Sequence, residues 1–136
     1  LPDFIVSNIN SPLAVMENPS RNAGHYLKFK LVATQTARDA IGARVSLHIS
    51  GRDVTRQLTG GDGYMASNER VVHFGLGAAK RIKQVTIHWP SGATSLLDAV
   101  PSDSSLTIIE GSILATVSEQ SNVTSIAAVP TAGGQQ

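Results

Sequence analysis

Apolar and polar side chains alternate along most of this chain with a period of two residues. The clearest stretches are 26–32, 44–50 and 84–89, in each of which at least three apolar side chains alternate with polar ones. Because successive side chains of a β-strand point to opposite faces of a sheet, each stretch predicts a strand with one buried face. Shorter candidate strands lie at 4–7, 13–17, 54–58, 71–74, 94–97 and 106–110.

Turn-forming residues separate these segments. Ser50-Gly51 suits a tight hairpin, and Pro90-Ser91-Gly92 places proline at the second position of a turn. The glycine-rich stretch 60–63 predicts a loop, and we interpret 37–43 as a loop that enters a strand rather than as a helix. Short strands at roughly ten-residue spacing predict an all-β fold, an antiparallel β-sandwich or partly open barrel of about 7–9 short strands.

The two ends of the chain differ in character from its middle. Residues 1–21 hold the apolar strand 4–7, whose unpaired edge would invite pairing with this domain's own sheet, with another domain or with a neighbouring copy. Residues 22–112 carry the regular strands and form the predicted β domain. Residues 113–136 form the C-terminal segment, which from 118 onward is small and polar apart from 126–129; this is typical of a tail or linker, or of a terminal strand that pairs with a partner. We expect assembly through these terminal strands.

Charge and composition narrow the classes of partner. Eleven Lys and Arg residues against ten Asp and Glu residues give a net charge of +1, with the two signs mixed along the chain. A nucleic-acid-binding protein usually gathers a basic excess on one face, so we expect no nucleic-acid partner. No apolar run approaches the roughly 20 residues that span a bilayer, so we expect no membrane span. The absence of cysteine excludes a disulfide framework.

Five ordered blocks of sequence resemble the ASPIC/UnbV domain family, at a spacing that agrees across 22–110. They are Gly24-His25-Tyr26-Leu27, Arg38-Asp39-Ala40-Ile41-Gly42-Ala43-Arg44-Val45, Gly63-Tyr64-Met65-Ala66-Ser67, His73-Phe74-Gly75-Leu76-Gly77 and Trp89-Pro90-Ser91-Gly92. The resemblance implies an extracellular or cell-surface module, secreted by bacteria, with no assigned activity and no cofactor.

The segment 3–8, together with 13–18, resembles the end of an FG-GAP/VCBS-type propeller repeat, which commonly precedes the ASPIC/UnbV domain. The Asp-rich calcium loop of such repeats does not occur in this sequence, so we expect no metal site.

Several residues in the family blocks suit structural roles. Gly42, Gly63, Gly75 and Gly77 are expected where the backbone needs a positive φ or a close approach. Phe74 and Trp89 would supply large apolar surface to a core with few aromatic residues. Pro90 and Gly92 belong to the predicted turn.

Candidate catalytic and metal-binding residues are sparse. Ser67 and His73 are the best pair for nucleophilic catalysis, but a Gly-x-Ser-x-Gly elbow is absent, and a solvent-facing strand histidine explains His73 more simply. The four histidines are scattered, and only His48 and His88 could pair across a sheet. Exposed strand histidines are the simpler interpretation here too. We therefore expect no enzyme, with a hydrolase at Ser67 and His73 as the least favoured alternative.

Ligand recognition is better supported than catalysis. Tyr64 lies in a glycine-rich loop with Met65, Ser67 and Asn68, which together would offer an aromatic plane with polar neighbours to a sugar or a peptide. The competing interpretation is that Tyr64 is buried and anchors the loop. The sequence thus predicts a non-catalytic extracellular interaction or assembly module that packs against a propeller or a neighbouring subunit. A carbohydrate-binding module that uses the Tyr64 loop is the alternative.

Overall fold

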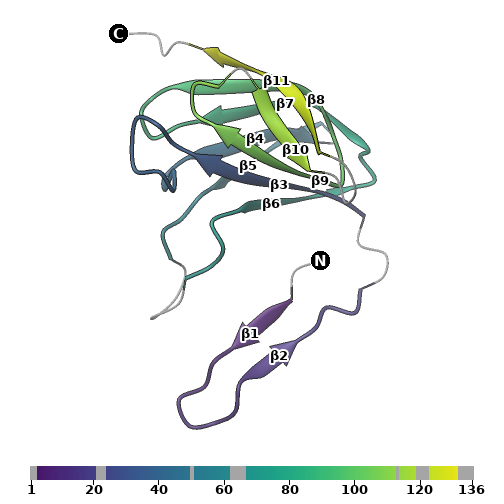
Figure 1. Ribbon diagram of the computed structural model, residues 1–136. Coiled ribbons are helices and arrows are strands. Elements are labelled where there is room, and N and C mark those ends of the chain that lie inside the picture. Colours follow the sequence, from purple (N-terminus) through teal and green to yellow (C-terminus); the bar gives the residue numbers. More distant parts are fainter. Residues whose placement is uncertain are drawn as a thin grey trace.

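The computed structural model describes residues 3–20, 24–49, 51–61, 67–112, 114–118 and 123–131, and their regular secondary structure is entirely β (Figure 1). The strands are β1 (Phe4–Val6), β2 (Ala14–Met16), β3 (His25–Val32), β4 (Arg44–Ile49), β5 (Arg52–Gln57), β6 (Val72–Gly77), β7 (Arg81–His88), β8 (Thr94–Pro101), β9 (Ser104–Ile109), β10 (Leu114–Ser118) and β11 (Val123–Thr131).

Nine strands form one sheet in the order β5-β4-β7-β8-β11-β10-β9-β3-β6, while β1 and β2 form a separate two-stranded sheet. Strand β11 joins the two halves, because its first part pairs with β10 and its last part with β8. The sheet therefore curls into a sandwich that is closed along β11 and open between its two edge strands, β5 and β6 (Figure 1). This confirms the predicted all-β sandwich or partly open barrel.

The pairing departs from the expected antiparallel pattern at one place. Strands β3 and β9 run parallel, with Leu27 opposite Ser104 and Val32 opposite Ile109. Several strands are also longer than predicted, for example β8, which continues from the expected 94–97 to Pro101. Residues 37–43 form turns, as expected, with Ala40 N–H donating to the Ala37 carbonyl at 2.9 Å.

The alternating apolar side chains fill the space between the two halves of the sheet. Leu27, Phe29 and Leu31 of β3 are at most 3% exposed, while Lys28 and Lys30 face outward. The ring of Phe29 packs edge-on against Phe74 of β6, with centroids 5.8 Å apart and planes at 86°. Other large buried side chains of the core are Val45, Leu47, Leu76, Ile82, Val85, Ile87, Trp89, Leu97, Val100, Leu106 and Ile108.

The turns follow the local sequence. Ile49 pairs with Arg52 across a two-residue connection in which Gly51 has φ +79°. At the other predicted turn, the Gly92 N–H donates to the Trp89 carbonyl at 3.0 Å, which leaves Pro90 at the second position.

The glycines of the family blocks fall into different groups. Gly42 and Gly77 have positive φ values of +95° and +59°, and Gly92 has +91°. Gly75 differs from the expectation, because it has neither a positive φ nor any atom within 4 Å of the position that a Cβ would take. Gly63 lies outside the described residues.

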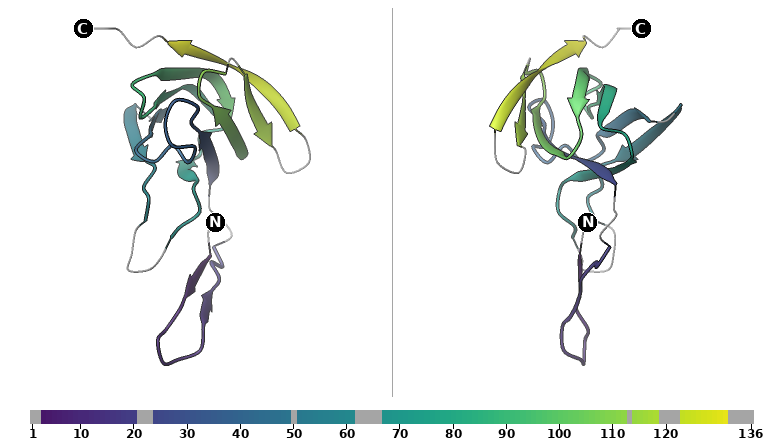
Figure 2. Two further views of the ribbon diagram at one scale, coloured as in Figure 1. Left: turned by 60° about the vertical axis from the view of Figure 1, so that its left-hand side comes forward. Right: turned by 90° about the vertical axis from the view of Figure 1, so that its right-hand side faces the viewer.

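The N-terminal hairpin lies outside the main sheet, whereas the C-terminal strands belong to it. The hairpin β1–β2 pairs only within itself and projects away from the main sheet, so the option that 4–7 adds to this domain's own sheet is wrong (Figures 1 and 2). The sequence allowed either a linker or a terminal strand at the C-terminal end. The structure shows two strands of the main sheet there, at 114–118 and 123–131. In β11, Ile126 pairs with Ala115 of β10 and Ala128 with Leu97 of β8, so each part of this strand pairs within the chain. The part of the chain that the structure describes contains no helix that could cross a membrane.

Candidate functional site

A groove lies at the open side of the sandwich, between the edge strands β5 and β6, and we call it the seam groove. Its walls come from the end of β5, the segment before β6, β6 itself and the start of β3. The residues that line it are Asp3, Gly24, His25, Tyr26, Lys28, Arg56, Gln57, Leu58, Thr59, Asn68, Glu69, Val71, Val72, His73, Phe74 and Gly75.

Arg56 covers the core where the sheet is open. It pairs with Val45 in the register of β4 and β5, and Val45 is fully buried, so Arg56 lies on the core-facing side of its strand. Its guanidinium carbon lies 5.8 Å from the ring centroid of Phe74 on β6. The side chain therefore bridges the two edge strands and places a positive charge in the groove, over an aromatic ring that attracts it.

The other side of the groove is the outer face of β3 and β6, where four residues form what we call the outer shelf: Tyr26, Lys28, His73 and Gly75. In the register of these strands Tyr26 lies opposite Gly75, and Lys28 opposite His73. The Lys28 Nζ lies 5.8 Å from the Tyr26 ring centroid.

The electrostatics of the outer shelf keep His73 uncharged. Partial burial lowers the pKa of His73 below its ordinary 6.5, the positive charges of Lys28 and Arg56 lower it further, and Glu69 opposes the shift. At pH 7 the imidazole is therefore neutral, with one ring nitrogen donating and the other accepting hydrogen bonds.

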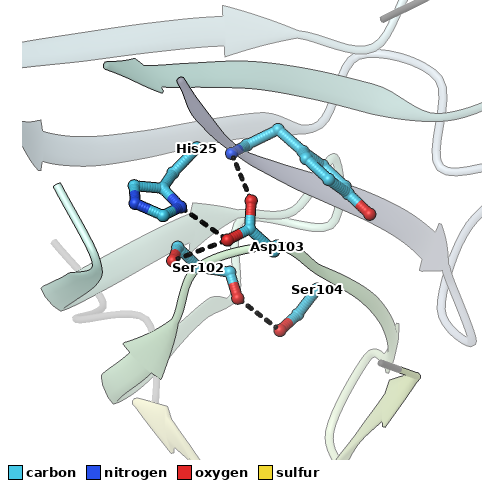
Figure 3. Close-up of polar contacts among 5 residues, drawn as sticks. His25, Ser102, Asp103 and Ser104 are labelled. Atoms are coloured by element: carbon cyan, nitrogen blue, oxygen red, sulfur yellow. Dashed lines mark hydrogen bonds and ion pairs between the residues drawn. The ribbon is translucent and has the colours of Figure 1, made fainter. Parts of the chain in front are cut away.

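A histidine–aspartate pair lies beside this shelf (Figure 3). His25 Nδ1 and Asp103 Oδ2 are 2.5 Å apart, and the Tyr26 N–H donates to the other carboxylate oxygen at 3.3 Å. The backbone N–H of Asp103 donates in turn to the Tyr26 carbonyl at 2.7 Å, and Asp103 has φ +58° in the short connection between β8 and β9. The pair thus fixes the start of β3 against the β8–β9 turn and orients the His25 ring at the groove.

An oriented imidazole is one component of a hydrolytic site, but a nucleophile must lie beside it. Ser102 Oγ donates to Asp103 Oδ2, the same carboxylate oxygen that contacts His25, and Ser104 Oγ donates to the Ser102 carbonyl (Figure 3). Within the described residues, no serine hydroxyl forms a hydrogen bond with His25. The expected pair Ser67 and His73 also forms no hydrogen bond in this part of the chain.

A second carboxylate holds three segments together, away from the groove. Glu110, 5% exposed at the end of β9, accepts hydrogen bonds from the Thr34 N–H at 2.8 Å and the Gln35 N–H at 3.0 Å. Ser91 Oγ donates to its other carboxylate oxygen, which ties in the β7–β8 turn. We call these contacts the Glu110 latch.

The lowered pKa values of Asp103 and Glu110 predict that the protein loses stability in acid. The hydrogen bond from His25 is the main cause that lowers the pKa of Asp103. Burial alone would raise the pKa of Glu110, but the hydrogen bonds from Ser91, Gln35 and Thr34 together lower it. A lowered folded-state pKa stabilises the fold above the ordinary values of 3.8 and 4.5, and this stabilisation disappears as the pH falls below them.

Urea unfolding at pH 6 and at pH 3 measures this loss. The free energy of unfolding should decrease between the two pH values, and the decrease should be smaller in the double variant Asp103→Asn with Glu110→Gln. An equal decrease in both proteins would show that these two carboxyls do not carry the acid sensitivity.

The residues expected from sequence to bind a ligand are only partly placed. Tyr64 and Met65 lie outside the described residues. Ser67 is exposed, and Asn68 lines the seam groove. Phe74 and Trp89 are buried, at 2% and 4% exposure.

The expected cross-strand pair of His48 and His88 is not formed. The register of β4 and β7 places Arg44 opposite His88. His48 instead contacts Asp53, with 2.7 Å between Nδ1 and Oδ1, and His88 contacts Thr94. Across the described ranges, no group of three or more His, Asp or Glu side chains is placed to hold a metal ion.

Sequence reasoning missed His25 with Asp103 and the Glu110 latch. His25 occurs in a block already noted, and Asp103 sits among serines, which is typical of a turn, but nothing in the sequence joins two residues so far apart.

A comparison with protein-family models decides the family. The model described as ASPIC and UnbV matches residues 33–115, more than half of the chain. The chain belongs to the ASPIC/UnbV family. The matched range of this ASPIC/UnbV domain runs from the end of β3 into β10, so it holds Arg56, His73 and the Glu110 latch, whereas His25 and Tyr26 precede it. Searches of curated proteins and of solved structures gave no match.

Proposed function

We propose that this ASPIC/UnbV domain is a non-catalytic extracellular interaction module, and that the hairpin β1–β2 docks it onto an FG-GAP-type propeller by completing a blade. The observation that carries the proposal is the apolar surface of this hairpin. Its exposed fractions are Phe4 59%, Ile5 66%, Val6 39%, Leu13 60%, Val15 61% and Met16 51%.

The apolar side chains occupy both faces of the hairpin. Ile5 pairs with Val15 and Phe4 with Met16, and adjacent pairs of an antiparallel ladder point to opposite faces. A two-stranded hairpin by itself is at most marginally stable in water. Exposed apolar surface of this kind marks an interaction site, because its burial against a partner is strongly favourable. The hairpin is therefore suited to lie between two other surfaces.

The two-sided character favours a propeller over other partners. Strands buried on both faces read as continuous apolar runs, as Phe4-Ile5-Val6 and Leu13-Ala14-Val15-Met16 do. Each blade of a propeller is a small sheet that packs between its two neighbours, so a hairpin that completes a blade is covered on both faces. A symmetric pairing of two hairpins would cover one face and leave the other in water. The resemblance of 3–8 to the end of an FG-GAP-type repeat agrees with this choice.

The extracellular location and the lack of catalysis are supported by the same family resemblance. Hydrolysis would need a nucleophile beside the oriented His25, and among the described residues no serine hydroxyl is hydrogen-bonded to that ring. The hydrolase alternative is therefore the weakest.

Binding to a propeller tests the proposal. The probe is a purified FG-GAP-type propeller that lacks the last hairpin of its final blade. The double variant Ile5→Lys with Val15→Glu introduces opposite charges at two paired positions, so the hairpin itself can still form. Docking would bury these charges, so binding should weaken at least about tenfold. The variant Ile109→Lys is the control, because Ile109 is an exposed apolar residue on β9. It should bind as the unmodified chain does.

Two outcomes would contradict the proposal. One is equal loss of binding in both variants. The other is association of two copies of the chain, instead of binding to the propeller, when the mass in solution is measured by light scattering.

Carbohydrate binding is the second candidate. The observation in its favour is that Asn68, adjacent to the expected Tyr64 loop, lines a groove that also contains an aromatic ring and several hydrogen-bonding side chains.

A further inference from the structure

We propose that the outer shelf of β3 and β6 is a sugar-binding subsite, in which one ring of an oligosaccharide lies on the bare backbone at Gly75, beside Tyr26. This inference rests on the carbohydrate-binding candidate and is independent of hairpin docking. It places the sugar on the strands and not at Tyr64.

Gly75 is the first observation. Glycine weakens a strand interior, since it costs backbone entropy and offers no side chain to pack, so its presence there calls for a reason. Gly75 has no positive φ that would require glycine, and a Cβ would meet no atom within 4 Å. The Tyr26 ring opposite it therefore does not lie over the glycine. Gly75 borders the register shift between His25 and Tyr26, and the result is an open patch of backbone, which is typical both of a bulge and of a place where a ligand approaches closely.

The residues around this patch match the chemistry of a sugar. The Tyr26 ring offers an apolar surface with a polar hydroxyl at its end, and both are features that the face and the rim of a pyranose can use. Lys28 donates hydrogen bonds, Glu69 accepts them, and neutral His73 does both. The adjacent hydroxyl groups of a sugar ring both donate and accept hydrogen bonds, so one ring can satisfy all of these side chains together.

The same set disfavours an anion as the ligand. Lys28 and Arg56 carry positive charges at the groove, but the carboxylate of Glu69 lies close enough to shift the titration of His73. Asp3 also lines the groove, so its two cations face two carboxylates and a phosphate or a carboxylate gains no net attraction, whereas a neutral polyhydroxylated ring needs none.

The variant Gly75→Val separates a binding role from a structural one. Valine suits a strand, and its side chain would enter open space, so the fold should be unchanged or more stable. The same side chain would occupy the place of the sugar. A purely structural glycine gives the opposite result, because its replacement would lower stability.

The experiment uses the whole chain on an array of cello-, xylo-, manno- and chito-oligosaccharides, followed by calorimetry with the strongest ligand. Gly75→Val should weaken binding at least about tenfold, with a urea midpoint equal to or above that of the unmodified chain. Tyr26→Ala should also weaken binding. Gln84→Val, an exposed strand position on β7 outside the groove, is the matched control and should bind normally.

Three results would overturn the inference. They are silence of the whole array, undiminished binding by Gly75→Val, and loss of binding that merely follows a lowered urea midpoint. Propeller binding should be unchanged in Gly75→Val, and sugar binding unchanged in Ile5→Lys with Val15→Glu. The failure of either proposal is therefore distinguishable from the failure of the other.

Discussion

Replacing Phe29 by alanine is expected to destabilise the domain by about 3–5 kcal/mol, the range measured for large aromatic side chains removed from protein cores. Phe29 has no exposed surface, it lies on β3 next to the edge strand β6, and its ring packs against Phe74 at the open side of the sandwich. Alanine would leave a cavity between the two halves of the sheet and remove the edge-on ring contact. Because the free energy of unfolding of a small domain is about 5–15 kcal/mol, this single substitution would remove a large share of the stability.

Phe4→Ala is a matched control for this prediction. Phe4 is 59% exposed in the hairpin, so its removal should change the free energy of unfolding of the main sheet by less than about 0.5 kcal/mol. Urea unfolding followed by Trp89 fluorescence measures both variants. Similar effects of the two substitutions would contradict the placement of the core.

Glu110→Ala is expected to cost about 2–3 kcal/mol, because hydrogen bonds to a charged group are stronger than those between neutral groups. The substitution removes the acceptor of the Thr34 and Gln35 N–H groups and of the Ser91 hydroxyl, and so releases three segments at once. The parallel pairing of β3 and β9 ends at this point, with the Glu110 N–H donating to the Val32 carbonyl at 2.9 Å.

The variant Glu110→Gln keeps the shape and one carbonyl acceptor but loses the charge, so about half of the effect should remain. The free energy of unfolding in urea at pH 7 is the measurement. If Glu110→Ala unfolds at the same urea concentration as the unmodified chain, the prediction is wrong, because water then replaces the three hydrogen bonds without loss of stability.

The sequence predicted the all-β architecture because burial on one face of a strand imposes a period of two. Stretches such as 26–32 and 84–89 show it plainly, and turns at Gly51 and Pro90 separate them. Local patterns of this kind depend only on neighbouring residues, so they can be recognised without knowledge of the tertiary fold.

Features that depend on long-range pairing were not predictable in the same way. The sequence left 126–129 as either a linker or a terminal strand and did not indicate its partners, which are β10 along the first part of β11 and β8 along its last part. The parallel pairing of β3 with β9 joins segments about 77 residues apart, as does the contact of His25 with Asp103. Nothing in the residues themselves specifies such a partner.

The candidate site shows the same division. Asn68 was predicted as part of the Tyr64 loop and His73 lies in a family block, and both line the seam groove. Tyr26 and Gly75 were also in those blocks, but their opposition across two strands depends on the register of β3 and β6. Gly75 was expected to serve the backbone, and only the open space above it points to a ligand.

Hydrogen–deuterium exchange at residues 4–16, in the chain alone and mixed with the propeller probe, tests the central claim most directly. An isolated two-stranded hairpin protects its amides only weakly, so exchange should be fast in the chain alone. In the complex, the pairing of β1 with β2 should become protected, while the amides of β3 should keep the protection that they already have. Equal and strong protection of the hairpin without the propeller would contradict the claim, because the hairpin would then need no partner.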